Sequence, residues 1–378
     1  MVRLTGLYKG LVRPLLFGFL SADMANELGQ FALRHPIFWK GIRTIPETQD
    51  ERLNITIGGI ALKNPVGAAP GFDKHCQMIE SMARMGFGYT IPGSITLNVN
   101  HKNNPKPRIL RYSEHESLVN CVQIPSKGAS YTAERLRHSQ SFNMRIIPCI
   151  EDFTLEESVK SFEMLQPLSD GLEISLRCPN EPKDGYKFNF MDPHNYEKLL
   201  DAVNKHKTNP IFVKMRNYIS EKERENRLEL VNISMKNGVD AITIPGSLVV
   251  EEPRLSAKIG NLSGRAIYQK TLANIRDIYQ ETKGKIVIKA RGGIHNSMDA
   301  FEAFRAGAST VELHTGLIYE GPSVARNICR GLLKLMDLWG FKSISEVIGS
   351  GRYPRAMATR DAVEEITKRV YRTVEPSM

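Results

Sequence analysis

From about residue 55 onward, short apolar or β-branched runs alternate with longer segments whose apolar residues recur at helical spacing. The eight short runs span residues 65–71, 89–96, 145–150, 172–178, 211–215, 241–246, 286–293 and 310–316. The helical patterns span residues 77–85, 155–165, 196–206, 221–237, 266–282, 298–306 and 324–338. Strands that alternate with helices form right-handed βαβ units, and eight such units close into a barrel. The pattern therefore predicts an α/β fold, a (β/α)8 TIM barrel.

The first 50 residues do not share this alternation. Their apolar run over residues 11–20 contains Arg13 and Pro14 and is much shorter than the ~20 residues of a membrane-spanning helix. Six basic residues face only two acidic ones before residue 45. A helix with an apolar face and basic flanks can lie in a membrane interface; the alternative is a helix that packs on the main domain. We expect a small helical extension over 1–50, the barrel over 51–348 and a C-terminal tail without an assigned role over 349–378.

Composition narrows the choice of class. Hydrophobic residues make up 41% of the 378 residues, enough for a large core. The five cysteines include no CxxC pair, which argues against a disulfide framework or a zinc site, and we expect no metal. The net charge of +10 suits an anionic membrane surface or acidic substrates, whereas nucleic acid ranks last because no basic run is interleaved with aromatic residues.

Glycines and hydroxyl residues gather at the carboxyl ends of the late strands, where the active site of such a barrel lies. Ser263-Gly264 is expected to open the helix after the sixth strand, Gly292-Gly293 follows the seventh and Thr315-Gly316 ends the eighth. Glycines let backbone N–H groups approach phosphate oxygens, and loops after strands seven and eight often bind phosphate. The alternative is that these glycines only form turns; three in the correct places favour phosphate binding.

Two lysines and one cysteine carry further chemistry. Lys74 follows the first strand, and Lys214 lies inside an apolar strand, where a charge is costly unless it is paired. Each is either a fixed cation beside a ring that becomes anionic, such as reduced flavin, or half of a structural ion pair. Cys178 closes the fourth strand beside Arg177; it is either an inert buried thiol or a thiolate that acts as a general base.

Several motifs in one order resemble the dihydroorotate dehydrogenase family over about residues 50–348. They are Asn64-Pro65-Val66-Gly67, Gly71-Phe72-Asp73-Lys74, Gly86-Phe87-Gly88, Gly93-Ser94-Ile95-Thr96, Asn104-Pro105-Lys106-Pro107-Arg108, Leu118-Val119-Asn120, Cys178-Pro179-Asn180, Val213-Lys214, Leu262-Ser263-Gly264, Gly292-Gly293 and Arg305-Ala306-Gly307-Ala308-Ser309. The segment Arg13-Pro14-Leu15-Leu16-Phe17 resembles the helical extension of the membrane-associated, quinone-using branch. In that branch the extension holds the membrane surface and forms a quinone tunnel towards FMN.

The resemblance implies an FMN enzyme that oxidises dihydroorotate to orotate in pyrimidine biosynthesis and passes electrons to quinone, in the cytoplasm and peripheral on a membrane. Cys178 would remove the C5 proton while C6 delivers hydride to flavin N5. The implied substrate contacts are Lys74, Asn120, Ser175, Asn180 and Ser247. The implied FMN contacts are Gly71, Lys74, Ser94, Lys214, Ser263, Gly264, Gly292, Gly293, His314 and Thr315.

The chain also departs from the family pattern. Its cysteine base is typical of the soluble branch, although its extension resembles the quinone branch. Ser175 and Gly246 stand where the family has asparagines, as does Pro148 or Cys149 on the third strand. Gln123 stands where the family prefers glycine, and Arg291 places an unusual cation beside the phosphate position.

These departures leave three functions open. Ser175, Gln123, Arg177 and waters could replace the lost contacts to dihydroorotate, or the substrate could be a different cyclic amide. The third alternative is a non-catalytic FMN-binding protein, because a fold alone does not fix function.

Overall fold

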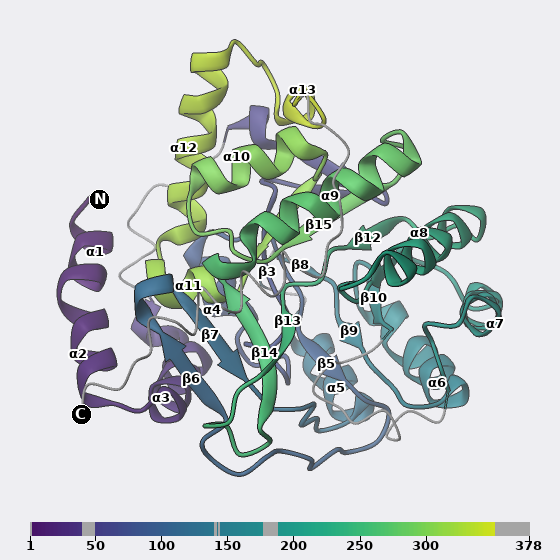
Figure 1. Cartoon of the computed structure of the whole chain (residues 1–378), viewed down its shortest axis with the longest axis horizontal. Coiled ribbons are helices and arrows are strands. Elements are labelled where there is room, and N and C mark those ends of the chain that lie inside the picture. Colours follow the sequence, from purple (N-terminus) through teal and green to yellow (C-terminus); the bar gives the residue numbers. More distant parts are fainter. Residues whose placement is uncertain (1, 40–49, 140–141, 143, 177–187, 352–378) are drawn as a thin grey trace.

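The computed structural model describes residues 2–39, 50–139, 142, 144–176 and 188–351. Ten short strand segments form a central parallel sheet (Figure 1). They are β3 (Val66–Ala68), β4 (Tyr89–Thr90), β5 (Gly93–Ile95), β8 (Arg145–Ile146), β9 (Cys149–Ile150), β10 (Leu172–Ser175), β11 (Ile211–Lys214), β12 (Ala241–Thr243), β15 (Val287–Arg291) and β16 (Thr310–Leu313).

Two of the predicted runs are each broken into two segments, and the pairing of these segments closes the sheet on itself. Strands β4 and β5 belong to one run, and β8 and β9 to the next. Strand β4 pairs with β8, and β5 pairs with β9. The strand order is β5-β9-β10-β11-β12-β15-β16-β3-β4-β8, and it therefore begins and ends in the same two neighbouring runs. The sheet is a closed barrel. The eight predicted strands and the barrel are confirmed.

An outer layer of helices surrounds the barrel (Figure 1). The helices are α4 (Ile79–Met85), α5 (Ala129–Ser139), α6 (Leu155–Leu165), α7 (Pro193–Asn204), α8 (Glu221–Lys236), α9 (Tyr268–Thr282), α10 (Ser297–Ala306), α11 (Thr315–Glu320), α12 (Val324–Trp339) and α13 (Ile344–Val347). Seven of them match the predicted patterns within three residues. The sequence pattern missed α5, whose core contact rests on few large apolar residues, Leu136 among them.

A second, antiparallel sheet lies over the barrel mouth, and the sequence pattern did not predict it (Figure 1). Its order is β13 (Leu248–Glu251), β14 (Ile259–Gly264), β7 (Ser117–Asn120) and β6 (Ile109–Tyr112). The Tyr112 hydroxyl donates to the Glu252 carboxylate across this sheet. The expectation that Ser263-Gly264 opens a helix is wrong: both residues end strand β14, and α9 begins only at Tyr268, because β14 pairs with β7 up to Gly264.

The N-terminal extension is helical, as predicted. Helix α1 (Val2–Leu7), a π-helical stretch (Tyr8–Val12) and α2 (Arg13–Phe19) form one rod, followed by α3 (Ala22–Arg34). The rod is held on α11: the Tyr8 hydroxyl donates to the Ile318 carbonyl at 2.6 Å, and Lys9 Nζ lies 2.9 Å from Glu320 Oε1. Within the described residues, no helix is both long and apolar enough to cross a membrane.

A small hairpin of β1 (Ile55–Ile57) and β2 (Ile60–Leu62) lies at the opposite end of the barrel, because its turn contacts residues that precede β11 and β12. The hairpin therefore lies at the amino ends of β11 and β12, and the carboxyl ends of the strands face the small sheet and the N-terminal helices.

Candidate active site

One cavity of about 930 Å³ runs from the carboxyl ends of the barrel strands to the N-terminal helices. At the barrel end it is lined by polar side chains and glycines. At the other end it is lined by apolar side chains of the extension, including Leu16, Phe17, Leu28 and Phe38. A long apolar passage therefore joins a polar chamber, and neither the barrel nor the extension forms it alone.

Glycine and hydroxyl residues of β14, of the turn after β15 and of α11 meet at one wall of the polar chamber. Gly264, Gly292 and Gly293 have φ angles of +96°, +115° and +74°, which favour glycine. A Cβ on Gly293 would lie 2.6 Å from the Tyr268 Cβ, so the backbone needs glycine here to lie this close to α9. The hydroxyls of Ser263 and Thr315 lie 3.0 Å apart at the same wall. This wall has the backbone shape and the hydroxyls that a phosphate group requires.

Lys214 lies at the chamber floor as part of a small polar chain. Its Nζ lies 3.9 Å from Glu151 Oε2, and the Ser94 hydroxyl donates to the same oxygen at 2.7 Å. Lys74 donates to the Gln123 carbonyl at 3.3 Å on another side of the chamber. Lys214 therefore has an ion-pair partner, and both lysines line the cavity. The role of either lysine beside a flavin ring stays a prediction.

His314 lies between the chamber and the first-strand loop. Its ring stacks on Phe72 with centroids 4.2 Å apart. Burial, together with the charges of Arg291 and Lys74, lowers the pKa of His314 to about 4. The imidazole is therefore neutral near pH 7 and offers one donor and one acceptor to a ligand.

Most of the predicted site residues line this one cavity. They are Gly71, Lys74, Ser94, Asn120, Lys214, Ser247, Ser263, Gly264, Gly292, Gly293, His314 and Thr315. Ser175 does not: it is buried in β10, and its hydroxyl has no hydrogen-bond partner among the described residues. Cys178 and Asn180 lie outside the described residues, so their roles stay predictions.

An ionic network that begins at the chamber floor with Arg291 and Glu312 and continues beneath it was not predicted. Lys289 Nζ lies 2.8 Å from Glu173 and 3.2 Å from Glu312, and Arg291 Nη2 lies 3.2 Å and 2.7 Å from the same two carboxylates. Arg291 was expected beside the phosphate position; its side chain instead points into the barrel, because these two carboxylates hold it there. Charged residues at alternate positions of a buried strand, Lys289 and Arg291, were the signal in the sequence.

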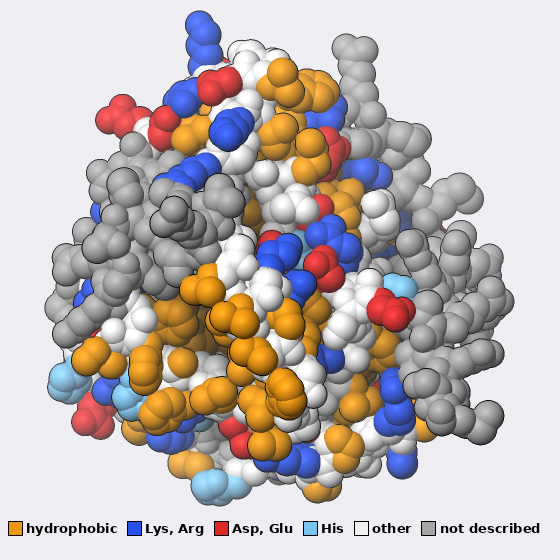
Figure 2. All heavy atoms as spheres, turned by 90° about the vertical axis from the view of Figure 1, so that its left-hand side faces the viewer, with side chains coloured by type: hydrophobic (Ala, Val, Ile, Leu, Met, Phe, Trp, Pro, Cys, Tyr) orange, Lys and Arg blue, Asp and Glu red, His pale blue; other side chains and the backbone are white. Residues whose placement is uncertain are grey.

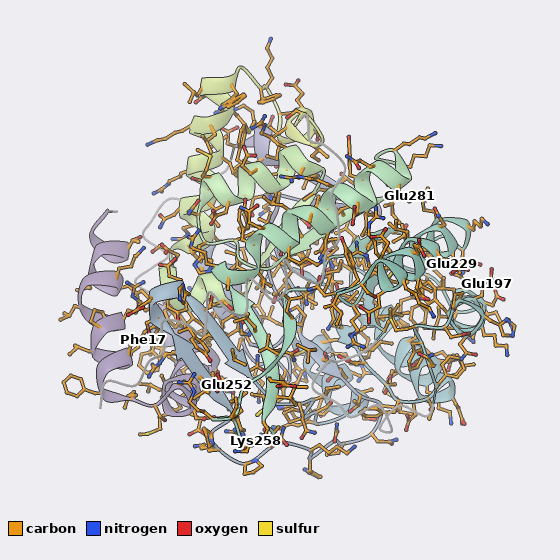
Figure 3. All side chains as sticks on the ribbon, in the orientation of Figure 1. Phe17, Glu197, Glu229, Glu252, Lys258 and Glu281 are labelled. Carbon is orange, nitrogen blue, oxygen red and sulfur yellow. The ribbon has the colours of Figure 1, made fainter. Side chains whose placement is uncertain are left out.

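Arg111 on β6 is another lining residue that sequence reasoning missed. Its guanidinium lies 4.6 Å from the centre of the Phe17 ring and donates to the carbonyls of Phe17 and Leu20. Phe17 lies between α2 and the barrel (Figure 3), and its ring meets that of Tyr319 edge-on at 5.4 Å. The Nη1 atom of Arg111 is buried and has no partner among the described residues.

Glu116, His295 and Glu320 bring three metal-type ligand atoms within 4.8 Å of one another beside the extension. Both carboxylates already have basic partners, since Arg265 Nε lies 2.9 Å from Glu116 and Lys9 binds Glu320. The proximity of His295, whose Nδ1 lies 3.5 Å from Glu116 Oε2, and then the hydrogen bond from Arg265 hold the pKa of Glu116 at about 2. This cluster joins the extension to the barrel by ion pairs.

A closed (β/α)8 barrel with a glycine-rich wall, two lysines and a large chamber at its carboxyl face has the architecture of the (β/α)8-barrel enzymes, whose active sites lie at this face. The family model for dihydroorotate dehydrogenase matches residues 52–336. The chain therefore belongs to the dihydroorotate dehydrogenase family, whose members are oxidoreductases acting on CH–CH donors.

Individual relatives agree with this assignment. A dihydroorotate dehydrogenase (quinone) of Roseiflexus sp. (strain RS-1) is 31% identical over 361 residues, which cover 92% of this chain and 99% of the relative. That of Natronomonas pharaonis is 30% identical over 363 residues, covering 91% and 99%. The crystal structure of the Eimeria tenella enzyme in complex with ferulenol has a TM-score of 0.76 at 24% identity, covering 89% of this chain and 97% of that one, and supports the fold.

Proposed function

We propose that this protein is an FMN-dependent enzyme that oxidises dihydroorotate to orotate in pyrimidine biosynthesis and passes the electrons to a quinone. The observation that carries the proposal is one continuous cavity, whose polar chamber suits a phosphate-bearing cofactor and a small polar substrate and whose apolar arm suits a lipid-soluble acceptor. Relatives of nearly the same length are named for the same donor and acceptor.

The glycine-rich wall fits the FMN phosphate. Gly264 and Gly293 hold backbone conformations that side chains rarely adopt, and the Ser263 and Thr315 hydroxyls face the same place. Lys214 and Ser94 would meet the ring system from the chamber floor. When bound, FMN supplies the ring that accepts a hydride.

The chain's own residues would hold the substrate and move its proton. Asn120 and Lys74 line the chamber, and an amide side chain offers one donor and one acceptor to a cyclic imide. Cys178, with Asn180 two residues later, would take the C5 proton as general base, as the family resemblance implies. The small sheet and the extension cover the chamber, which limits its contact with water.

Arg111 suits the quinone because it offers a buried N–H, unpartnered within the described part of the chain, where the apolar passage meets the chamber. A quinone carbonyl is an uncharged acceptor that such a donor can bind without a counter-ion. Burial lowers the pKa of Arg111, but a guanidinium remains protonated in proteins.

The extension also suits a peripheral place on a membrane. Leu11, Leu15, Phe19, Phe31 and Phe38 are each about half exposed or more, and Figure 2 shows hydrophobic side chains gathered over the lower part of this face. Together these side chains form a large apolar surface in contact with water, and surfaces of this kind are typical of protein or membrane interaction sites. Burying them in lipid would bring the mouth of the passage to the quinone's own phase.

One spectrum tests the central claim. The purified protein should show flavin absorbance, lose it when dihydroorotate is added without oxygen, and regain it when a short-chain quinone is added. Bleaching without reoxidation by quinone would contradict the acceptor alone. A protein that neither carries nor takes up FMN would contradict the proposal as a whole.

A different cyclic amide is the second candidate, because the asparagines that the family has at positions 175 and 246 are replaced here. Ser175 does not line the cavity, and Gly246 offers no side chain. Sites that bond polar groups discriminate strongly between substrates. Other dihydropyrimidines should be compared with dihydroorotate for anaerobic bleaching; the second candidate is abandoned if only dihydroorotate reduces the flavin.

A further inference from the structure

The chamber floor is ionic where such barrels are usually filled by Val, Ile and Leu. Two ion pairs reach it: Lys214 with Glu151, and Arg291 with Glu312. A third pair, Lys289 with Glu173, is completely buried beneath them and does not line the cavity. The three acids and three bases balance in charge, so the floor's effect on a ligand depends on which charge lies nearer to it.

Both floor pairs have the same orientation. The side chains of Lys214 and Arg291 keep 15% and 9% of their surface exposed, whereas those of Glu151 and Glu312 keep 1% and 0%. The cations thus face the cavity and the carboxylates lie behind them. Each pair is a small dipole whose positive end points towards the ligand.

Arg291 is held rigidly in this place. Its Nε and Nη2 donate to Glu312 Oε2 at 2.9 Å and 2.7 Å, and Nη2 also reaches Glu173 Oε1 at 3.2 Å. Its aliphatic stem passes over Gly246, where a Cβ would lie 2.6 Å from both Cγ and Cδ of Arg291. A glycine at position 246 is therefore what leaves room for the arginine.

We infer that Arg291 is a second positive pole of the cofactor site, a positioning residue that acts with Lys214 to favour the anionic form of the ring bound above them. The inference rests on the proposed function. A ring that gains a hydride becomes more negative, so a fixed positive pole stabilises the reduced form more than the oxidised form. Gly246, which stands where the family has asparagine, then leaves the space that the Arg291 side chain occupies.

The size of the effect depends on how far the anion lies from each end of the pair. For an anion about 6 Å from the guanidinium and about 9 Å from the carboxylate, at an effective dielectric constant of about 20, the pair favours the anion by about fivefold in its equilibrium constant. An unpaired cation would do more, but its buried charge would be costly.

Sulfite is a suitable probe, because its addition to flavin places a negative charge on the ring. The test compares the holoprotein with Arg291→Met/Glu312→Gln, which removes the floor pair without changing net charge. The matched control is Lys289→Met/Glu173→Gln, which removes the deeper pair. We expect sulfite affinity to fall about fivefold or more and the flavin midpoint potential to become more negative in the first double variant only.

Three outcomes are distinguishable. If both double variants behave like the unaltered protein, or both change alike, the inference is wrong and the proposed function stands. If the unaltered protein binds no FMN, the proposed function fails and the inference with it. If the first double variant does not fold, Gly246→Ala displaces Arg291 and keeps its charge, and unchanged sulfite affinity in that variant would also overturn the inference.

Discussion

The substitution Lys289→Met tests the buried network where the structure defines it best. Lys289 is completely buried, and its ammonium group binds two carboxylates that are also completely buried. Removing it leaves Arg291 as the one cation in contact with Glu173 and Glu312 among the described residues. Breaking a buried pair in this way costs about 3–5 kcal/mol in the free energy of unfolding.

The double variant Lys289→Met/Glu173→Gln should be more stable than the single variant, because it leaves no uncompensated charge. Replacing a buried pair by neutral groups is often close to neutral, so we expect at least about 2 kcal/mol of the loss to return. The assay is urea unfolding of the apoprotein followed by tryptophan fluorescence and circular dichroism, with the slope compared among variants.

The pH dependence gives an independent check. Burial by itself would raise the pKa of Glu173, but Lys289 and Arg291 hold it below its usual value. A carboxyl of lowered pKa stabilises the fold above its unfolded pKa, and this stability is lost as the pH falls through the folded value. Without Lys289, one of the two carboxyls should bind a proton more readily. The loss of unfolding free energy in the single variant should therefore become smaller as the pH falls from 7 to 5. A deficit under about 1 kcal/mol at pH 7, or a double variant no more stable than the single one, would refute the reasoning.

Three further predictions concern the site and the surface. Cys178→Ala should lower turnover about 10²- to 10⁴-fold while Cys178→Ser keeps part of it, measured as the anaerobic rate of flavin reduction; unchanged turnover would show that Cys178 is not the base. Arg111→Ala should raise the KM for quinone several-fold and leave the rate of flavin reduction by dihydroorotate unchanged, whereas equal loss in both steps would point to a structural role. In Leu15→Ser/Phe19→Ser, a smaller fraction of the protein should sediment with phospholipid vesicles, while turnover with a water-soluble acceptor should not change. Vesicle binding equal to that of the unaltered protein would exclude this face as the membrane surface.

The titration of His314 gives a prediction with a defined sign. Its pKa falls from 6.5 to about 4 on folding, mainly through burial. Between these values the unfolded chain binds the extra proton and the folded chain does not, so stability falls as the pH is lowered from 6.5 to 4. His314→Phe should flatten this part of the stability curve, and an equally steep fall in the variant would show that other groups cause it.

Local sequence pattern was sufficient to define the barrel and the general place of its chemistry. Strand runs such as 211–215 and 310–316 are short, apolar and separated by amphipathic helices, so periodicity alone could find them. Their carboxyl ends must meet in a closed parallel barrel. Residues as distant in the chain as Gly71, Lys214 and Thr315 could for this reason be assigned to one site from the sequence alone.

The small sheet, the orientation of Arg291 and the apolar passage depend on contacts between distant parts of the chain, which the local sequence pattern does not encode. The small sheet over the mouth depends on pairing between β7 and β14, which are far apart in the chain, and this pairing moved Ser263-Gly264 from a helix start to a strand end. The orientation of Arg291 depends on Glu173 and Glu312 of two other strands. The apolar passage exists because α2 and α3 pack across the barrel mouth, and such a cavity belongs to the packing of elements rather than to any one of them.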